Sequence, residues 1–161
     1  MRVKLAVAAV LVVSIGLLAT PAGARPSGTW WFRGVQVMPG GVVRDGRIIY
    51  DHGNVVVIPA VTDGFDTCLS GYVCLFADIN WGGDIVQFTT CCAWNNLSDY
   101  GFNNTASSWR NRKAVDAQIA MGTDGGGSKL CLNNNDYASS MPSGWDNGVS
   151  SIRIRDAGTY C

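Results

Sequence analysis

The sequence contains a single histidine, His52, and it lacks the short motifs of the common hydrolases and nucleotide-binding proteins. There is no His-Glu-x-x-His and no Gly-x-Ser-x-Gly, and the glycine run at 125–127 is not followed by Lys-Ser/Thr. A Ser-His-Asp site would have to use His52. Asp78, Asp84 and Asp99 leave a carboxylate-based glycosidase open, but acidic residues in polar loops are usually only solvated. We expect a protein that is not an enzyme.

A second long apolar segment is missing as well, and the one long apolar run lies at the N-terminus. Two basic residues precede the apolar run Leu5 to Leu18, and Ala22 and Ala24 supply the small side chains that signal peptidase requires. The run is short for a membrane span. We therefore expect residues 1–24 to be a secretory signal peptide and the mature protein to be secreted. An uncleaved signal anchor is the less favoured alternative.

An excess of basic charge is absent as well. Lys and Arg number twelve, as do Asp and Glu, so removal of Arg2 and Lys4 with the signal peptide leaves a slight acidic excess. Nucleic acids and anionic membranes select a basic surface, which this chain does not offer. We expect neither as a partner.

Six cysteines are present, and all of them follow the signal peptide. In an oxidising compartment such an even set indicates a disulfide framework, whereas a zinc site is less favoured because paired C-x-x-C spacings are missing. A bond that closes the short loop between Cys68 and Cys74 is the preferred pairing. Adjacent cysteines rarely pair with each other because of strain, so no bond is expected between the two neighbours. The candidates are Cys68, Cys74, Cys91, Cys92, Cys131 and Cys161.

The mature sequence divides into residues 25–63, which contain no cysteine, and residues 64–161. Within the first part, the β-branched runs Gly46–Tyr50 and Asn54–Ile58 flank a short glycine-containing loop and predict a hairpin. An isolated hairpin is marginal in water. This N-terminal extension must therefore either dock on the main body or belong to a removable pro-segment. Trp30–Phe32 would be an exposed aromatic cluster if this segment were free, which slightly favours docking.

Residues 64–161 contain short β-prone runs separated by Gly- and Asn-rich turns, and no long stretch has helical periodicity. This pattern predicts an all-β sandwich or barrel. The runs are Tyr72–Phe76, Ile85–Thr89, Ser107–Arg110, Ala117–Ala120, Leu130–Leu132 and Ser150–Ile154.

A six-residue motif occurs twice in this part, at Asn103–Ser108 and Asp146–Ser151. Each copy has two Asn/Asp residues, two free positions and then Ser-Ser, with an aromatic residue before it and an apolar residue and arginine after it. Asn and Asp tolerate left-handed backbone and offer oxygens, and serine hydroxyls can hold a loop. A single copy would indicate only a polar turn before a strand. Two copies, 43 positions apart, indicate an internal repeat.

A second feature repeats at nearly the same distance. Phe76, Trp81 and Gly83 form an aromatic-x4-aromatic-x-Gly pattern in the first copy, and Gly125-x-Gly127 occupies the corresponding place in the second. The glycine would supply a positive φ in a folded hairpin, with Trp81 packing over it. The second hairpin lacks the aromatic pair and is expected to be degenerate.

The hairpin pattern followed by (Asn/Asp)-(Asn/Asp)-x-x-(Ser/Thr)-Ser resembles microbial βγ-crystallin Greek-key domains. The wider stretches from Cys68 to Gly83 and from Asn96 to Trp109 are similar to peptidase inhibitor family I36. That family is actinobacterial, shares the crystallin fold and includes an inhibitor of metalloproteinases. The resemblance covers roughly residues 64–161. It implies two Greek keys in a βγ-crystallin-like sandwich, with an N-terminal hairpin extension, and a secreted inhibitor whose partner is an extracellular protease.

The resemblance also implies a calcium site shared between the two motifs, the basis of an alternative function as a calcium-binding module with a structural, stress or antimicrobial role. Ca²⁺ takes six to eight oxygen ligands, and the single carboxylate here, Asp146, predicts weak binding. The loops could equally serve only to close the Greek keys. The implied ligands are Asn103, Asn104, Thr105, Ser107, Asp146, Asn147, Gly148 and Ser150.

The sequence does not identify the inhibitory segment. The aromatic-containing stretch Cys91–Asn96 and the segment Arg112–Val115 are candidates, but neither is assigned as the reactive site. Trp94 within the first stretch is equally compatible with a place in the core, which is the commoner position of tryptophan.

Overall fold

A computed structural model describes residues 28–161, and the expected signal peptide lies outside this part. The described residues form thirteen strands and four 3-10 turns, with no α-helix among them. None of their helical turns is long or apolar enough to cross a membrane. The prediction of an all-β protein is therefore confirmed.

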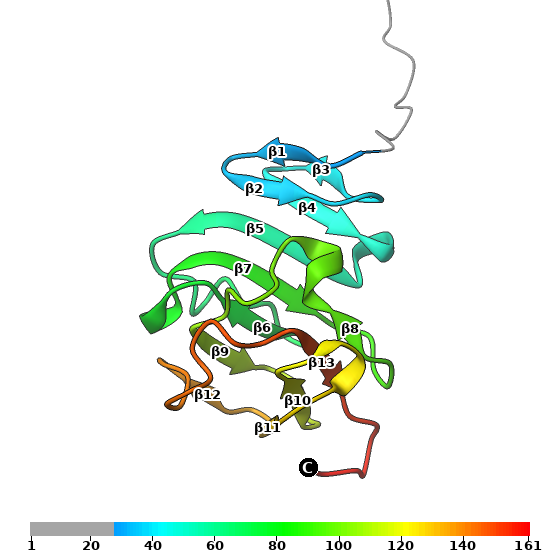
Figure 1. Ribbon diagram of the computed structural model, residues 1–161, viewed down its shortest axis with the longest axis vertical. Coiled ribbons are helices and arrows are strands. Elements are labelled where there is room, and N and C mark those ends of the chain that lie inside the picture. Colours follow the sequence, from blue (N-terminus) through cyan, green and yellow to red (C-terminus); the bar gives the residue numbers. More distant parts are fainter. Residues whose placement is uncertain (1–27) are drawn as a thin grey trace, which may run out of the picture.

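The strands pack as two antiparallel sheets and a separate small hairpin (Figure 1). The strand order is β12-β9-β6-β7-β5-β4-β3 in the seven-stranded sheet and β11-β10-β13-β8 in the four-stranded sheet. The N-terminal extension contributes β1 (Trp30–Phe32), β2 (Val35–Val37), β3 (Val42–Arg44), β4 (Arg47–Tyr50), η1 (Asp51–Gly53) and β5 (Val55–Val61).

The remaining elements form two Greek keys. The first half contains β6 (Val73–Phe76), η2 (Ile79–Trp81), β7 (Gly83–Phe88), β8 (Asn95–Asn96), η3 (Leu97–Tyr100) and β9 (Ser108–Asn111). The second half contains β10 (Ala117–Ala120), η4 (Thr123–Gly125), β11 (Lys129–Leu132), β12 (Tyr137–Ala138) and β13 (Ser151–Ile154). All six predicted runs of this domain are strands, and their bounds differ from the prediction by at most two residues.

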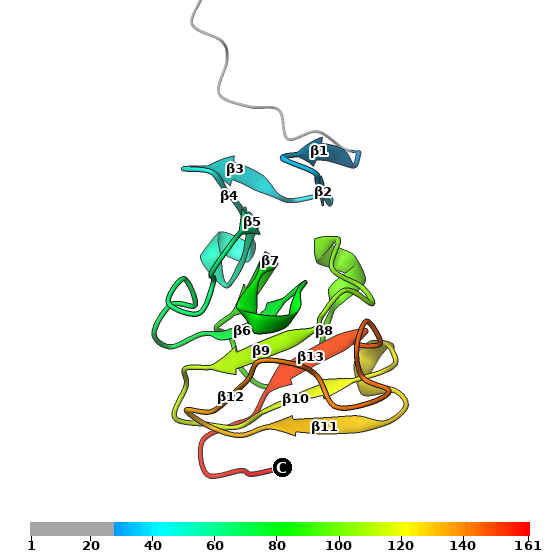
Figure 2. The same ribbon diagram turned by 90° about the vertical axis from the view of Figure 1, so that its left-hand side faces the viewer.

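Each half gives its third strand to the other half's sheet. Strand β12 pairs with β9 of the first half, and β8 pairs with β13 of the second (Figure 2). Neither half can therefore complete its sheet without the other. The expectation of two Greek keys packed in one sandwich is confirmed.

The core lies between the two sheets. Successive side chains of a strand point to opposite faces, so Val73 and Leu75 of β6 face the sandwich interior, where they join Ile119 and Ile152 of the opposite sheet. On the outer face of the same strand, Cys74 and Phe76 belong to a second, smaller buried cluster with Ile85. The outer face of β6 and β7 is thus also covered.

The N-terminal extension docks on this domain by strand addition. The predicted hairpin is present as β4 and β5, and β5 continues the sheet by pairing with β7, from Val55 opposite Phe88 to Val61 opposite Gly83. Side chains of the extension, such as Val57 and Ile48, are fully buried in the main core. In this structure β3, β4 and β5 of the extension are an integral part of the sheet.

A buried serine hydroxyl closes each repeated hairpin. Ser108 Oγ donates to Asp78 O over 2.7 Å and accepts from the backbone N–H of Trp81 over 3.2 Å. In the second half, Ser151 Oγ donates to Gly122 O over 2.6 Å and accepts from the N–H of Gly125 over 3.1 Å. The last serine of each motif is therefore a clamp on the hairpin of its own half.

The second hairpin folds like the first, although it lacks the aromatic pair. Gly125 stands where the first hairpin has Trp81, and both have positive φ, 76° and 59°. A Cβ built on Gly125 would overlap the ring of Trp94, which therefore packs directly on this glycine. Tyr137 holds the matching place in the other half, with its ring centroid 5.8 Å from that of Trp81. The ring of Trp94, the residue before β8, thus takes the place of the missing one.

We expect Ser108→Ala and Ser151→Ala each to lower the free energy of unfolding by about 1–3 kcal/mol, because each leaves a buried carbonyl and a buried N–H without a partner. Urea denaturation measures the change. Ser143→Ala, at an exposed position, is the matched control and should leave stability unchanged. Equal midpoints for all four proteins would contradict the clamp role.

The Trp94 contact gives a second test. Gly125→Ala should destabilise by at least about 2 kcal/mol, through overpacking against the indole and through the positive φ. Gly144→Ala isolates the φ cost, because Gly144 has φ 81° and open space around its Cα. In a double-mutant cycle measured by urea denaturation, Trp94→Ala should relieve part of the Gly125→Ala penalty. Strict additivity would contradict the packing.

Candidate functional site

The two repeated motifs meet at the centre of the domain. Asn104 donates its backbone N–H to Val149 O over 2.9 Å, and Asn147 donates its N–H to Ala106 O over 3.1 Å. Both asparagines have left-handed backbone, with φ of 55° and 54°. The exchange of bonds has approximate twofold symmetry, so the motifs that are 43 positions apart in sequence form one paired structure.

The residues implied as calcium ligands all lie in these paired loops. Ser150 Oγ donates to Asn104 Oδ1 over 3.2 Å, which brings side-chain oxygens of the two motifs together. Within the second motif, Asn147 Nδ2 donates to Asp146 Oδ2 over 3.4 Å. Ser107 and Ser150 are buried, Thr105 and Gly148 are half-buried, and Asn103, Asn104, Asp146 and Asn147 are exposed.

This donor set fits a hard cation that binds weakly. Amide, hydroxyl and backbone oxygens are suitable ligands for Ca²⁺, and fewer carboxylates mean a lower affinity. Asp146 is the single carboxylate in the two motifs. The side chains that would hold the ion are those of the paired motif loops, from both halves of the domain.

A different segment stands out for its rigidity, the tied loop of residues 64–71. It follows β5 and packs on the outer face of β6 and β7. A disulfide between Cys68 and Cys74 joins it to β6, which confirms the pairing preferred from the sequence. Gly64 begins it with a 2.7 Å backbone hydrogen bond from its N–H to Trp81 O. A Cβ there would lie 2.7 Å from Ile85 Cδ1, so only glycine fits.

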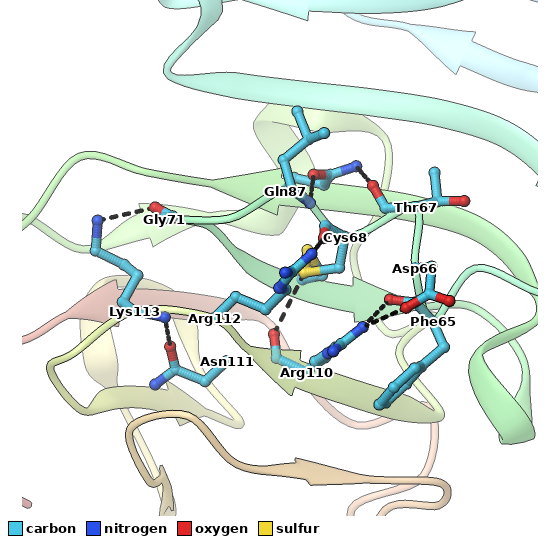
Figure 3. The surroundings of a disulfide bond; sticks show 12 residues. Phe65, Asp66, Thr67, Cys68, Gly71, Gln87, Arg110, Asn111, Arg112 and Lys113 are labelled. Carbon is cyan, nitrogen blue, oxygen red and sulfur yellow. Dashed lines mark hydrogen bonds and ion pairs between the residues drawn. A yellow bond between two sulfur atoms is a disulfide. The ribbon is translucent and has the colours of Figure 1, made fainter.

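Side chains from the neighbouring strands hold the backbone of the tied loop (Figure 3). Gln87 of β7 is fully buried; its Nε2 donates to Thr67 O over 3.2 Å, and its Oε1 accepts the Leu69 N–H over 3.1 Å. Arg112 Nη1 donates to Cys68 O over 2.7 Å. A buried amide is costly unless both of its ends are bonded, and here the loop satisfies both.

Arg110 of β9 holds the start of the tied loop. Its guanidinium lies over the ring of Phe65, 3.5 Å from the centroid, donates to Phe65 O and pairs with Asp66 at 3.3 Å. Phe65 in turn packs against Trp81 and Tyr137. A cation over an aromatic face adds attraction to the packing. The first turn of the loop is therefore fixed by charge and by apolar contact.

Lys113 holds the other end of the tied loop. Its half-buried ammonium donates to Gly71 O over 3.0 Å and to Thr89 O over 2.9 Å, and burial lowers the pKa of this amine. Arg112 and Lys113 are thus occupied as supports. This finding bears on Arg112–Val115, one of the two candidate inhibitory segments, because its two basic side chains point to the tied loop.

The second candidate, Cys91–Asn96, is also largely committed to the fold. Trp94 packs on Gly125 and lies under Arg153, 4.9 Å from its guanidinium carbon to the ring centroid. Asn96 bonds Asp124 through both ends of its amide, at 3.0 and 2.8 Å. These side chains hold the second hairpin in place.

The pairing of the remaining cysteines corrects one expectation. Cys91 is bonded to its neighbour Cys92, and Cys131 is bonded to Cys161. The other four cysteines are bonded as Cys68–Cys74 and Cys131–Cys161, and Cys92 of the adjacent pair has a φ of 86°. Strain argued against this pairing in sequence, but the loop accommodates it with left-handed backbone.

The residues considered for catalysis do not assemble into a hydrolase site. His52 lies on η1 with a side chain 91% exposed, and within residues 28–161 its carboxylate neighbour is Asp51 at 3.8 Å. His52 and Asp99 both line an open groove of about 690 Å³. Asp84 has a structural role, because its Oδ1 accepts the Ala60 N–H over 2.7 Å. No serine hydroxyl in the described chain bonds His52.

Sequence reasoning missed the supports of the tied loop. Gln87 interrupts the apolar run of β7, and such a polar residue in a strand buried on both faces is the signal that could have identified it. The three basic supports, Arg110, Arg112 and Lys113, leave no such signal. In sequence, a basic residue that bonds a loop cannot be told from one that is only solvated.

Comparison with known structures identifies the fold. A βγ-crystallin domain from work on the evolution of the eye lens fold is 20% identical, with a TM-score of 0.51, over 61% of this chain and 95% of that one. A βγ-crystallin domain from Flavobacterium johnsoniae is 27% identical, with a TM-score of 0.46, over 54% of this chain and 97% of that one. No curated protein matches the chain in sequence.

Residues 61–119 match the family model of peptidase inhibitor family I36. These residues include the whole tied loop, its four supporting side chains and the first repeated motif. A match to inhibitors agrees with the expectation that the chain is not an enzyme. Residues 61–119 thus match peptidase inhibitor family I36, within a domain that has the βγ-crystallin fold.

Proposed function

We propose that this protein is a secreted inhibitor of extracellular peptidases. The observation that carries the proposal is the match of residues 61–119 to peptidase inhibitor family I36. Metallopeptidases are the first target class to consider, because the family that the sequence resembles includes an inhibitor of metalloproteinases. The residues considered for catalysis, which do not come together, offer no competing hydrolase function.

The physical properties of the domain suit inhibition. A segment already fixed in its bound shape avoids the ordering entropy that a flexible substrate loses on binding. The tied loop has this property, because a disulfide and four side chains hold it. A rigid loop on a disulfide-bonded β-domain also resists the local unfolding that proteolysis needs.

Export is part of the same proposal. The N-terminal sequence has the features of a signal peptide, and all six cysteines are paired in disulfides. Disulfides persist in oxidising compartments and are rare in the reducing cytosol. A protein with this combination would meet its target proteases outside the cell.

We expect the purified protein to inhibit at least one protease of a panel that contains a thermolysin-like, a subtilisin-like and a trypsin-like enzyme. Residual activity at increasing inhibitor concentration gives the stoichiometry and the inhibition constant. The same protein after reduction and alkylation is the control, and it should lose inhibition because the loop is no longer closed. Full activity of all three enzymes at stoichiometric excess would contradict the proposed function.

Weak calcium binding is the second candidate, and the contact between Ser150 and Asn104 across the two motifs favours it. The ion would be held by oxygens of the paired motif loops and would link the two halves of the domain. Such a module would have a structural, stress or antimicrobial role. The tied loop and the paired motif loops are different segments of the chain, so inhibition and calcium binding do not exclude each other.

If calcium binds with a Kd of about 1 mM, then 10 mM Ca²⁺ should stabilise the protein by about 1.4 kcal/mol. Urea denaturation with CaCl₂ or MgCl₂ measures this. Asp146→Asn removes the one carboxylate of the motifs and should reduce the effect. Asp45→Asn, at an exposed turn with φ 51° that Asn also tolerates, is the control. An unchanged midpoint with calcium would count against the site.

A further inference from the structure

We propose that the tied loop is the surface that enters the cleft of the target protease, with Leu69 as its anchoring side chain. This inference rests on the proposed inhibitory function and adds to it a contact site and a preference among proteases. The loop is assigned from its geometry, because the sequence motifs did not point to it.

The first step of the argument is that the loop backbone is held from behind. Four of its carbonyls accept side-chain hydrogen bonds, those of Phe65, Thr67, Cys68 and Gly71, and the Leu69 N–H donates to a side chain. The donors come from β7, from β9 and from the two residues that follow β9. Figure 3 shows these side chains directed at the backbone of the loop. The exposed side chains of the loop, those of Asp66, Leu69 and Ser70, form its free face.

The second step is what this free face presents. The side chain of Asp66 is 97% exposed, and Ser70 is exposed. Leu69, which follows the disulfide-bonded Cys68, is 37% exposed. A few side chains that fill well-packed, desolvated pockets near the centre of an interface carry most of its binding energy. Leu69 is the one large apolar side chain that the tied loop exposes. Its backbone is fixed by Gln87, so burial of the side chain would add few ordering costs.

The third step is a comparison with the other two candidate segments. In Arg112–Val115, the basic side chains are the supports of the tied loop, so they are not free for a protease pocket. In Cys91–Asn96, Trp94 and Asn96 hold the second hairpin. The tied loop is held by side chains of other elements and still exposes three side chains of its own, those of Asp66, Leu69 and Ser70.

The loop chemistry also selects among proteases. A trypsin-like pocket requires a basic side chain, and residues 64–71 contain neither lysine nor arginine. Leu69 suits an enzyme whose specificity pocket takes a bulky apolar side chain, as thermolysin-like and subtilisin-like proteases do. We therefore expect the inhibited enzymes to be of the apolar-pocket type, and trypsin-like enzymes to be unaffected.

Leu69→Asp tests the anchor. It should raise the inhibition constant for the sensitive protease at least about 30-fold, as loss of an interface anchor does, while Leu69→Met should stay within about threefold of the unchanged protein. Val42→Asp is the matched control, because Val42 is 38% exposed and lies on β3, away from the loop. It should leave inhibition unchanged. Equal urea midpoints for the four proteins exclude a folding effect.

A double variant, Cys68→Ala with Cys74→Ala, tests the rigidity of the loop. Without the disulfide, the protease should cut the chain within residues 64–74, which mass spectrometry detects, and inhibition should become transient. The outcomes separate the two proposals. If the unchanged protein inhibits no apolar-pocket protease, the proposed function fails. If it inhibits one and Leu69→Asp inhibits equally well, or the double variant is cut only elsewhere, the assignment of the tied loop is overturned.

Discussion

Exchange of the third strand between the two Greek keys is the constraint on which the rest of this domain depends. Strand β12 completes the sheet of the first half and β8 completes that of the second, so the two halves must face each other with one fixed register. That register brings Asn104 to Val149 and Asn147 to Ala106. The oxygen-rich contact between the motifs is a consequence of the topology, whether or not an ion occupies it.

The tied loop follows from a second constraint, the burial of both faces of β6 and β7. Phe76 and Ile85 point away from the sandwich core and need a cover, which the segment after β5 provides. A covering loop must satisfy its own backbone polar groups away from water. Gln87 and the basic side chains after β9 do this. The rigidity that suits an inhibitor is thus the result of ordinary packing requirements.

Much of the fold was predictable from sequence, because the repeat places glycines, serines and asparagines where left-handed backbone and hydroxyl clamps occur. The two-residue strands β8 and β12 were not, since so short a strand has no periodicity and exists only through its partner. The role of Trp94 was not predictable either, because its ring packs on Gly125, which lies 31 positions later in the sequence. The Cys91–Cys92 bond depends on a local φ that sequence does not reveal.

Strand addition by the N-terminal extension changes the edges of the sheet. Without it, the six residues of β7 would present an open row of backbone donors and acceptors, the feature that allows sheets of different molecules to join. With it, the sheet ends at β3, which has three residues and carries Arg44, and at the two-residue β12. Short, charged edges oppose edge-to-edge association. The extension therefore replaces a long open edge at β7 with a short, charged one at β3.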